Sequence, residues 1–352
     1  MKIDEGTMAE LGNLTLVTDR IQITNNTVST TDQVIDILDA VYVFVFGILG
    51  GSIGNILLLL VIGVNRKLWT VPNTYVVSIA ISDLMITAEA FPVIFASNVN
   101  RRNVLVLGGI DSMTACKIQC AIHILSVSVS LYSIMVVAVT RFLCVCKPDY
   151  YRSHIGMRSS IITNVCIWIV CILLVAVSVG FQVVKTEYNP YITACGFSHS
   201  RSLVYVYVSN ILSIWLPMII TLFCYIMIYR TVHEAGERMK QHEHNGNGQT
   251  KTLSRKDLTV IRVLFFTYAA FVICWLPYSI MAFVALHTGS KPELAYKITV
   301  RMCMSNACAN SVVYGLFNPK FRREYKRFLC WPVLAVIQRK ILPDPESHSS
   351  TT

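Results

Sequence analysis

Residues 133–148 read SIMVVAVTRFLCVCKP, an apolar run in which Arg141 is the one charged side chain before Lys147. The run belongs to an apolar segment long enough to cross a membrane as a helix. A charge at membrane depth is costly and usually functional. The stretch therefore predicts a transmembrane helix in which Arg141 has a task, although no acidic residue stands beside it.

Six other apolar segments accompany this one, and the composition agrees with a membrane protein. Hydrophobic residues make up 54% of the 352 residues and charged residues 14%, whereas soluble proteins carry about 25% charged residues. Each segment supplies the roughly 20 apolar residues that a membrane-spanning helix needs, and none alternates as a membrane strand would. We therefore predict an all-α membrane protein, a seven-transmembrane helix bundle over residues 34–317. Its segments are 34–64, 74–98, 114–146, 160–184, 203–229, 260–287 and 296–317.

The distribution of basic residues gives the orientation. With residues 1–33 outside, 20 of the 30 Lys and Arg residues fall on cytoplasmic segments, as the positive-inside rule requires. We expect a multi-pass protein of the plasma membrane whose extracellular N-terminal tail, residues 1–33, carries glycosylation sequons at Asn13 and Asn25. The net charge of +10 then reflects topology and membrane lipids with anionic headgroups, not nucleic acid.

Two of the twelve cysteines are expected on the outer side. Cys116 opens the third helix, and Cys195 is the single cysteine of the loop between the fourth and fifth helices. The outside is oxidising, so we predict a disulfide that ties this loop to the third helix. Cys116 is the expected partner, and Cys120, one turn deeper, is the alternative.

Each helix also carries a characteristic motif. Together, and in this order, the motifs resemble those of the class A (rhodopsin-like) G-protein-coupled receptors along the whole membrane core. They are Gly54-Asn55, Ser78-Ile-Ala-Ile-Ser-Asp83-Leu84, Arg141, Trp168, Pro217 with Tyr225, Cys274-Trp275-Leu276-Pro277 and Asn310-Ser-Val-Val-Tyr314.

The resemblance implies a receptor that binds an extracellular ligand inside the bundle and activates a heterotrimeric G protein. Pro277 removes a backbone hydrogen bond and should kink the sixth helix, whose lower half swings outward in the family. Receptor kinase and arrestin are further implied partners, with serines and threonines at 347–352 as candidate kinase sites. A membrane enzyme or a transporter is the rival hypothesis, but the sequence has no GxGD, GxSG or HExxH motif and no evident inverted repeat.

Asp83 is a carboxylate at mid-membrane, so it must be neutralised, paired or bound to a cation. If the bundle closes as in the family, Ser130, Asn306 and Asn310 face it, and oxygen ligands of this kind suit a hard cation. The resemblance implies an allosteric sodium ion at this site and no other cofactor. The alternative is a protonated Asp83 in a structural polar network.

The ligand site should open outward between the upper halves of the third, fifth, sixth and seventh helices. His123 stands where amine receptors carry an aspartate, and Met304 where opsins carry the retinal lysine, which argues against both classes. Arg301 either pairs with Glu89 or, with His123, holds an anionic or strongly polar ligand group. The predicted ligand-binding residues are His123, Phe197, Trp275, Tyr278, Arg301 and Met304.

Within the family, the chain is most similar to the melatonin receptors. Asn310-Ser-Val-Val-Tyr314 lacks the usual proline, as theirs does, and Phe197 could stack on an indole. By contrast, Ser213 and Ser178 replace a histidine and an asparagine that contact ligand in that group. The resemblance implies coupling to an inhibitory G protein, and it leaves peptide, lipid and other small polar ligands open.

The predicted activation switch surrounds Arg141. In the family an adjacent acid restrains this arginine at rest, but here Thr140 takes that place. Asp257, at the foot of the sixth helix, is the remaining candidate partner, and Tyr225 and Tyr314 complete the switch. Because one of two restraints is missing, we expect basal activity.

Residues 318–331 are predicted to form an amphipathic cytoplasmic helix 8. Phe321, Tyr325 and Phe328 recur at helical spacing, and Lys and Arg fill the other face, as in helices that lie on a leaflet. Cys330 is a candidate palmitoylation site. Residues 332–352 complete the chain as a cytoplasmic tail.

Overall fold

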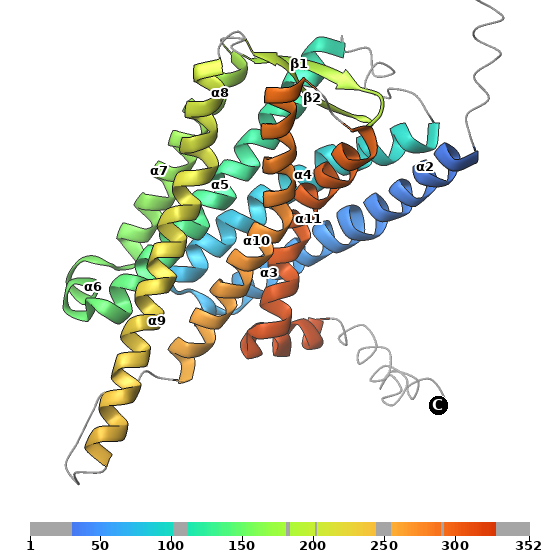
Figure 1. Ribbon diagram of the computed structural model, residues 1–352. Helices are drawn as coiled ribbons and strands as arrows, with labels where there is room; N and C mark the ends of the chain where they lie inside the picture. The colour runs from blue at the N-terminus through green and yellow to red at the C-terminus, as the bar shows by residue number, and fades with distance from the viewer. Residues whose placement is uncertain are drawn as a thin grey trace, which may run out of the picture.

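The computed structural model describes residues 30–100, 112–180, 184–200, 203–243, 255–289 and 292–328. Long helices run roughly alongside one another as one elongated bundle, and a two-stranded hairpin lies across one end of it (Figure 1). The bundle agrees with the predicted seven-helix architecture, and the hairpin is the β-structure within these residues.

Seven long helical segments form the bundle in the described part of the chain, and three of them contain a π-helical stretch. They are α2, η1 and α3 (Thr30–Tyr42, Val43–Ile53, Gly54–Val64); α4 (Val71–Asn100); α5 (Ser112–Cys146); α7 and η4 (Met157–Val175, Ala176–Gly180); α8, η5 and α9 (Leu203–Asn210, Ile211–Trp215, Leu216–Glu243); α10 (Arg255–Thr288); and α11 (Glu293–Phe317). The short helices η2 (Arg66–Leu68) and α6 (Pro148–His154) lie between long ones, and a last helix spans residues 319–328.

Six helices of the described residues are long and apolar enough to cross a membrane. The remaining segment, α11, is less apolar because it carries Glu293, Lys297 and Arg301. It is nevertheless enclosed, because it packs against α10, α4 and η1, and its Lys297 and Arg301 are 4% and 5% exposed. α7 instead presents apolar side chains such as Ile161 and Ile172 outward, as a helix beside lipid does.

Glycines in η1 bring the first helix close to α4. A Cβ atom added at Gly47 would overlap the Phe91 ring, and one added at Gly51 would overlap the Thr87 methyl group. Small residues allow such close approach in membranes, where helix association depends on packing. The N-terminal end of the first helix is thereby held where Asp39 can reach α11.

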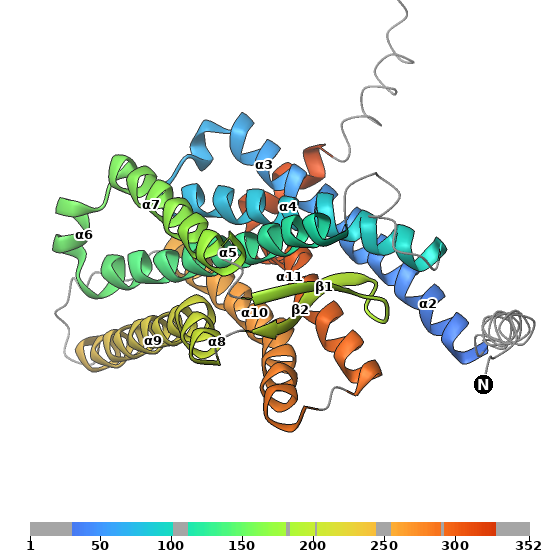
Figure 2. The ribbon, with the colours of Figure 1, turned by 90° about the horizontal axis from the view of Figure 1, so that it is seen from above.

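The hairpin consists of β1 (Val184–Asn189) and β2 (Ala194–Ser200), which pair antiparallel. Its register runs from Asn189 opposite Ala194 beside the turn to Val184 opposite Ser200, with an irregularity after Lys185. Seen from above, it crosses the end of the bundle over α10 and α11 (Figure 2), and it packs against α4 and α5. The sequence did not predict these strands.

The last helix lies at the opposite end of the bundle from the hairpin (Figure 1). Its Phe321 is fully buried in an apolar cluster with Leu58 of α3 and Tyr314 of α11, and the Phe321 and Tyr314 ring centroids lie 5.3 Å apart. The helix is amphipathic as predicted, and Phe321 of its apolar face packs on protein. Its contact with a leaflet stays a prediction. Cys330 lies outside the described residues.

Candidate ligand site and cytoplasmic switch

A disulfide fastens the hairpin to α5. Cys195 of β2 is bonded to Cys116, with 5.2 Å between their Cα atoms. The Cys195 backbone N–H also donates to Oε1 of Gln119, 2.8 Å away. Cys120 is a buried free thiol, so the predicted Cys116 pairing is confirmed and the alternative is wrong.

Aromatic rings connect the halves of α5, α10 and α11 that lie nearer the hairpin. The Trp275 ring lies 6.3 Å from the ring of His123 and 6.0 Å from that of Tyr278, and Tyr278 lies 6.4 Å from Tyr296. Below them, Phe271 stacks on Trp275 at 5.6 Å with an interplanar angle of 9°. We call His123, Trp275, Tyr278 and Tyr296 the ring cluster. Three of the predicted ligand-binding residues therefore lie together.

The ring cluster lies beneath the hairpin and carries a polar atom without a partner. A Cβ atom at Gly196 of β2 would lie 3.8 Å from the Tyr296 hydroxyl, so the strand passes directly over this ring. Trp275 is 4% exposed, and its indole N–H has no acceptor within the described residues. Because a buried donor is stabilised by a partner, this N–H can donate to a bound molecule. The Phe197 side chain lies outside the described residues, although its backbone pairs with Thr186.

Arg301 is bound within the protein. Its Nε and Nη2 donate to the two carboxylate oxygens of Asp39 at 2.7 and 2.9 Å. Nη2 also donates to the carbonyl of Ile192 at 2.6 Å and to Oγ1 of Thr193 at 3.2 Å, while Nη1 lies 3.8 Å from the Met304 sulfur. The guanidinium thus joins α11 to the first helix and to the turn of the hairpin.

This arrangement contradicts one of the two sequence-based interpretations of Arg301, the pairing with Glu89, and bears on the other. Its acidic partner is Asp39 of α2, not Glu89. Its charge is already neutralised by a bidentate carboxylate, the geometry in which arginine binds most strongly, so an anionic ligand would have to displace Asp39. Met304 is 4% exposed and lies against this guanidinium. Both residues are therefore engaged within the protein, and their contact with a ligand stays a prediction.

Further polar residues complete the network around Asp39. Asn98 of α4 donates from Nδ2 to Asp39 Oδ2 at 2.8 Å. Lys297 Nζ lies 3.5 Å from the same oxygen and 3.2 Å from Asp36 Oδ1, and 5.6 Å from the centre of the Tyr191 ring. We call Asp39, Arg301, Lys297 and Asn98 the outer network. A signal for it existed in the sequence, because Asp36 and Asp39 share a face of one helix and Lys297 and Arg301 share a face of another.

The hairpin turn is shaped to meet the outer network. Thr193 has a φ of 51°, a left-handed conformation that is uncommon for a residue other than glycine. Its hydroxyl donates to Oδ1 of Asn98 at 2.8 Å and accepts from Arg301. The Asn189 side chain closes the turn by accepting from the backbone N–H of Tyr191 at 2.9 Å. The strained residue is thus held by bonds to α4 and α11.

Asp83 lies deep in the bundle, as predicted. It is 2% exposed, and its Oδ2 accepts from Nδ2 of Asn310 at 2.8 Å. Ser130 Oγ, Asn306 Oδ1 and Asn310 Oδ1 are buried without a hydrogen-bond partner in the described part of the chain. α4, α5 and α11, which carry these residues, pack together around α4. The unpaired buried oxygens on α5 and α11, together with the Asp83 carboxylate on α4, are of the type that a hard cation takes as ligands.

At the other end of α5, Thr140 does not restrain Arg141. Its hydroxyl donates to the Val137 carbonyl at 2.8 Å, a bond within its own helix. Arg141 lies within electrostatic reach of the Tyr225 and Tyr314 phenols, and its buried Nε–H has no acceptor among the described residues. The structure therefore brings together three of the predicted switch residues. The Asp257 side chain, Asn13 and Asn25 lie outside the described residues.

The comparison with known proteins agrees with this geometry. The family model of the 7 transmembrane receptor (rhodopsin family) matches residues 54–314. Melatonin receptor type 1A of Phodopus sungorus is 29% identical over 293 residues, 82% of this chain and 79% of that receptor. Type 1B of Mus musculus is 31% identical over 282 residues, 79% and 74% of the two chains. The crystal structure of squid rhodopsin has a TM-score of 0.71 at 18% identity and covers 91% of this chain and 93% of its own, which shows the same fold.

The chain belongs to the rhodopsin family of seven-transmembrane receptors. It is a multi-pass G-protein-coupled receptor and not an enzyme, and among receptors it is similar to those for melatonin. Membership in the family implies an extracellular ligand and a G-protein partner.

Proposed function

We propose that this receptor binds a small, uncharged aromatic ligand at the ring cluster and signals through an inhibitory-class G protein. The observation that carries the proposal is the line of rings from His123 to Tyr296, which contains no carboxylate and includes the unpartnered indole N–H of Trp275. Aromatic rings bind other rings in stacked or edge-on geometry. The similarity to melatonin receptors favours an indole amide and inhibitory coupling.

One pair of substitutions favours a ligand that differs from melatonin. Ser178 replaces an asparagine and Ser213 a histidine that contact ligand in melatonin receptors. The Ser178 hydroxyl donates to the Leu174 carbonyl at 2.7 Å and lies 2.5 Å from the Tyr205 hydroxyl. This serine therefore hydrogen-bonds the fourth helix to the fifth. Another small polar ligand is therefore the second candidate, ahead of peptides and lipids.

A ligand panel read out by cyclic AMP tests the proposal. Cells that express the receptor should respond to at least one indole amide or related small aromatic compound with a fall in cyclic AMP. Trp275→Leu should raise the half-maximal concentration at least about tenfold, because it removes stacking and the indole donor. Trp215→Leu is the matched control, since Trp215 is 40% exposed on η5. Responses to peptides or lipids alone, or equal effects of both variants, would contradict it.

The orientation and the mechanism belong to the same proposal. The Cys116–Cys195 disulfide supports an extracellular hairpin end, since disulfides form in oxidising compartments. The basic last helix then lies in the cytoplasm, and the N-terminus is outside the plasma membrane. Ligand binding would turn the stacked pair Trp275 and Phe271, and α10, which contains Pro277, would swing its lower half outward to admit the G protein. Receptor kinase, arrestin and membrane lipids are proposed as further partners.

A sodium ion at Asp83 is proposed as a restraint on this motion. Asp83 would supply the charge, and the unpaired oxygens of Ser130, Asn306 and Asn310 are the candidate neutral ligands. Replacing potassium by sodium in the assay buffer should therefore lower ligand-free nucleotide exchange severalfold, because the ion binds the resting state better. Asp83→Asn should remove the difference between the two salts while the protein stays folded. Equal sodium sensitivity of the variant and the parent would exclude Asp83 as the site.

A further inference from the structure

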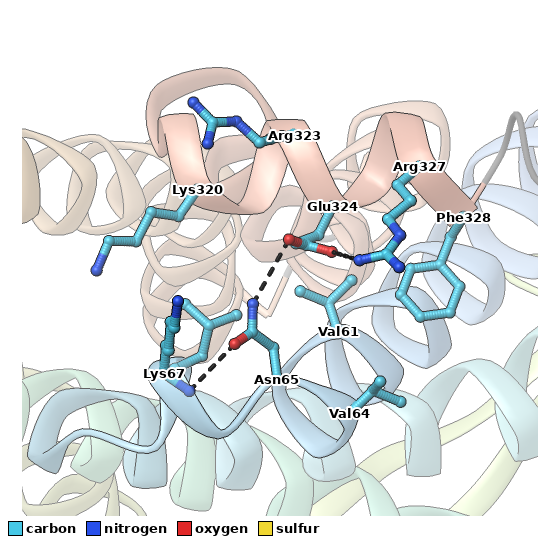
Figure 3. A pocket seen from close by; sticks show the side chains of 10 residues that line it. Val61, Val64, Asn65, Lys67, Lys320, Arg323, Glu324, Arg327 and Phe328 are labelled. Carbon is cyan, nitrogen blue, oxygen red and sulfur yellow. Dashed lines mark hydrogen bonds and ion pairs between the residues drawn. The ribbon is translucent and has the colours of Figure 1, made fainter.

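A pocket of ≈ 490 Å³ lies between the loop that follows α3 and the last helix of the chain. The loop side contributes Asn65, Lys67 and Leu68, and the helix side contributes Lys320, Arg323 and Arg327. Figure 3 shows Lys67 and Lys320 reaching from the two elements on one side of the pocket, with Val61, Val64 and Phe328 on the other. The pocket lies at the end of the bundle remote from the hairpin.

The pocket carries an excess of positive charge. Lys67, Lys320, Arg323 and Arg327 oppose one acid, Glu324, which gives four positive charges against one negative. The acid is engaged, because Asn65 Nδ2 donates to its Oε1 at 3.5 Å and Arg327 Nη1 lies 3.9 Å from its Oε2 (Figure 3). Within the described residues, Lys67, Lys320 and Arg323 form no ion pair with a carboxylate. Three cations therefore remain for an external anion.

The apolar side of the pocket continues up the outside of the first helix. Ile53, Ile56, Leu60 and Val64 are 53%, 47%, 47% and 71% exposed, and their spacing of three or four residues puts them on one face. Val64 belongs both to this stripe and to the pocket. A molecule with an anionic head and an apolar chain would satisfy both surfaces, whereas a free phosphate would use the cations alone.

We propose that this pocket binds the phosphorylated headgroup of an anionic phospholipid, whose acyl chain lies along the stripe. Lysine and arginine are the side chains that bind phosphate oxygens, arginine through a planar fork. The inference rests on the cytoplasmic orientation proposed above, because anionic lipids are concentrated in that leaflet. It does not depend on which ligand binds at the ring cluster. The lipid would fasten the last helix to the first loop from the membrane side.

The test measures binding of a fluorescent dioctanoyl phosphatidylinositol bisphosphate to the purified full-length receptor by fluorescence polarisation. Lys320→Gln/Arg323→Gln should weaken binding at least about tenfold, because it removes two of the pocket's cations that have no carboxylate partner in the described residues. Arg322→Gln/Lys326→Gln is the matched control, because it removes the same charge from exposed positions of the same helix outside the pocket. The control should change affinity less than about twofold, because neither side chain lines the pocket and exposed charges away from a bound anion are screened by salt.

A second variant and two competitors complete the design. Lys67→Gln should weaken binding severalfold and its neighbour Arg66→Gln should not, because Lys67 lines the pocket and Arg66 does not. Unlabelled dioctanoyl phosphatidylcholine should fail to compete, and free inositol trisphosphate should compete far more weakly than the unlabelled anionic lipid. Equal weakening by the pocket and control variants would overturn the site. Equal competition by inositol trisphosphate would overturn the lipid in favour of a soluble phosphate.

Discussion

Replacing Asp39 by Asn is expected to lower the melting temperature of the purified receptor by about 5–10 °C. Asp39 and Arg301 are 8% and 5% exposed and form a bidentate pair. Removing one partner leaves a buried charge uncompensated, which typically destabilises a protein by about 3–5 kcal/mol. Arg301→Gln should have an effect of similar size. Both should also reduce the amount of receptor at the cell surface.

Matched variants separate this pair from the general effect of losing an acid. Asp36→Asn should change the melting temperature little, because the Asp36 side chain is 31% exposed and exposed ion pairs contribute about 0–1 kcal/mol. The double variant Asp39→Leu/Arg301→Met should be more stable than either single charge removal, since apolar replacement of a whole buried pair is often neutral. If Arg301→Gln abolished the ligand response with no change in melting temperature, Arg301 would be a ligand contact and the structural account of it would be wrong.

Restoring an acid beside Arg141 is expected to silence ligand-free signalling. Thr140→Asp should lower basal nucleotide exchange about tenfold, because a partly buried ion pair of about 1.4 kcal/mol shifts a two-state equilibrium by that factor. In the parent protein the Thr140 hydroxyl bonds to its own helix and leaves Arg141 unrestrained there. Thr140→Asn is the matched control, since it adds similar bulk without charge and should leave basal exchange nearly unchanged.

Removing the acid at Asp257 should have the opposite effect on basal signalling. Asp257→Ala should raise basal exchange severalfold if Asp257 is the remaining restraint on Arg141, because loss of an ion pair of about 1 kcal/mol shifts a two-state equilibrium by that factor. Nucleotide exchange on a G protein added to receptor-containing membranes measures the effects of both Thr140→Asp and Asp257→Ala. If neither Thr140→Asp nor Asp257→Ala changes the basal rate, this account of the switch is wrong.

The helices and the disulfide were predictable from the sequence because they depend on local properties. Apolar segment length sets a membrane helix, and a cysteine on the oxidising side selects its partner from few candidates. α11 shows the limit of the apolar count, because the segment 296–317 was counted as a span, yet α11 is not among the six helices of the described residues that are long and apolar enough to cross a membrane. Its motif Asn310-Ser-Val-Val-Tyr314 was the better indicator.

The outer network was not predicted because it is set by three-dimensional packing. Arg301 and Asp39 are 262 positions apart, and the sequence analysis named Glu89 as the candidate acid. Which acid pairs with Arg301 depends on the close approach of η1 to α4 at Gly47 and on the turn at Thr193. Neither feature has a sequence pattern of its own. Similarly, the apolar face of the last helix predicted burial of Phe321 but could not tell protein from lipid.

Ligand-free nucleotide exchange is the measurement that tests the central claim most directly. Membranes containing the receptor are mixed with a purified inhibitory-class G protein, and binding of a non-hydrolysable GTP analogue is followed over time. We predict exchange clearly above that of membranes without the receptor, with Thr140→Asp lying between the two. Exchange equal to the receptor-free rate, both in the absence of ligand and across the ligand panel, would contradict the conclusion that this chain activates such a G protein through Arg141.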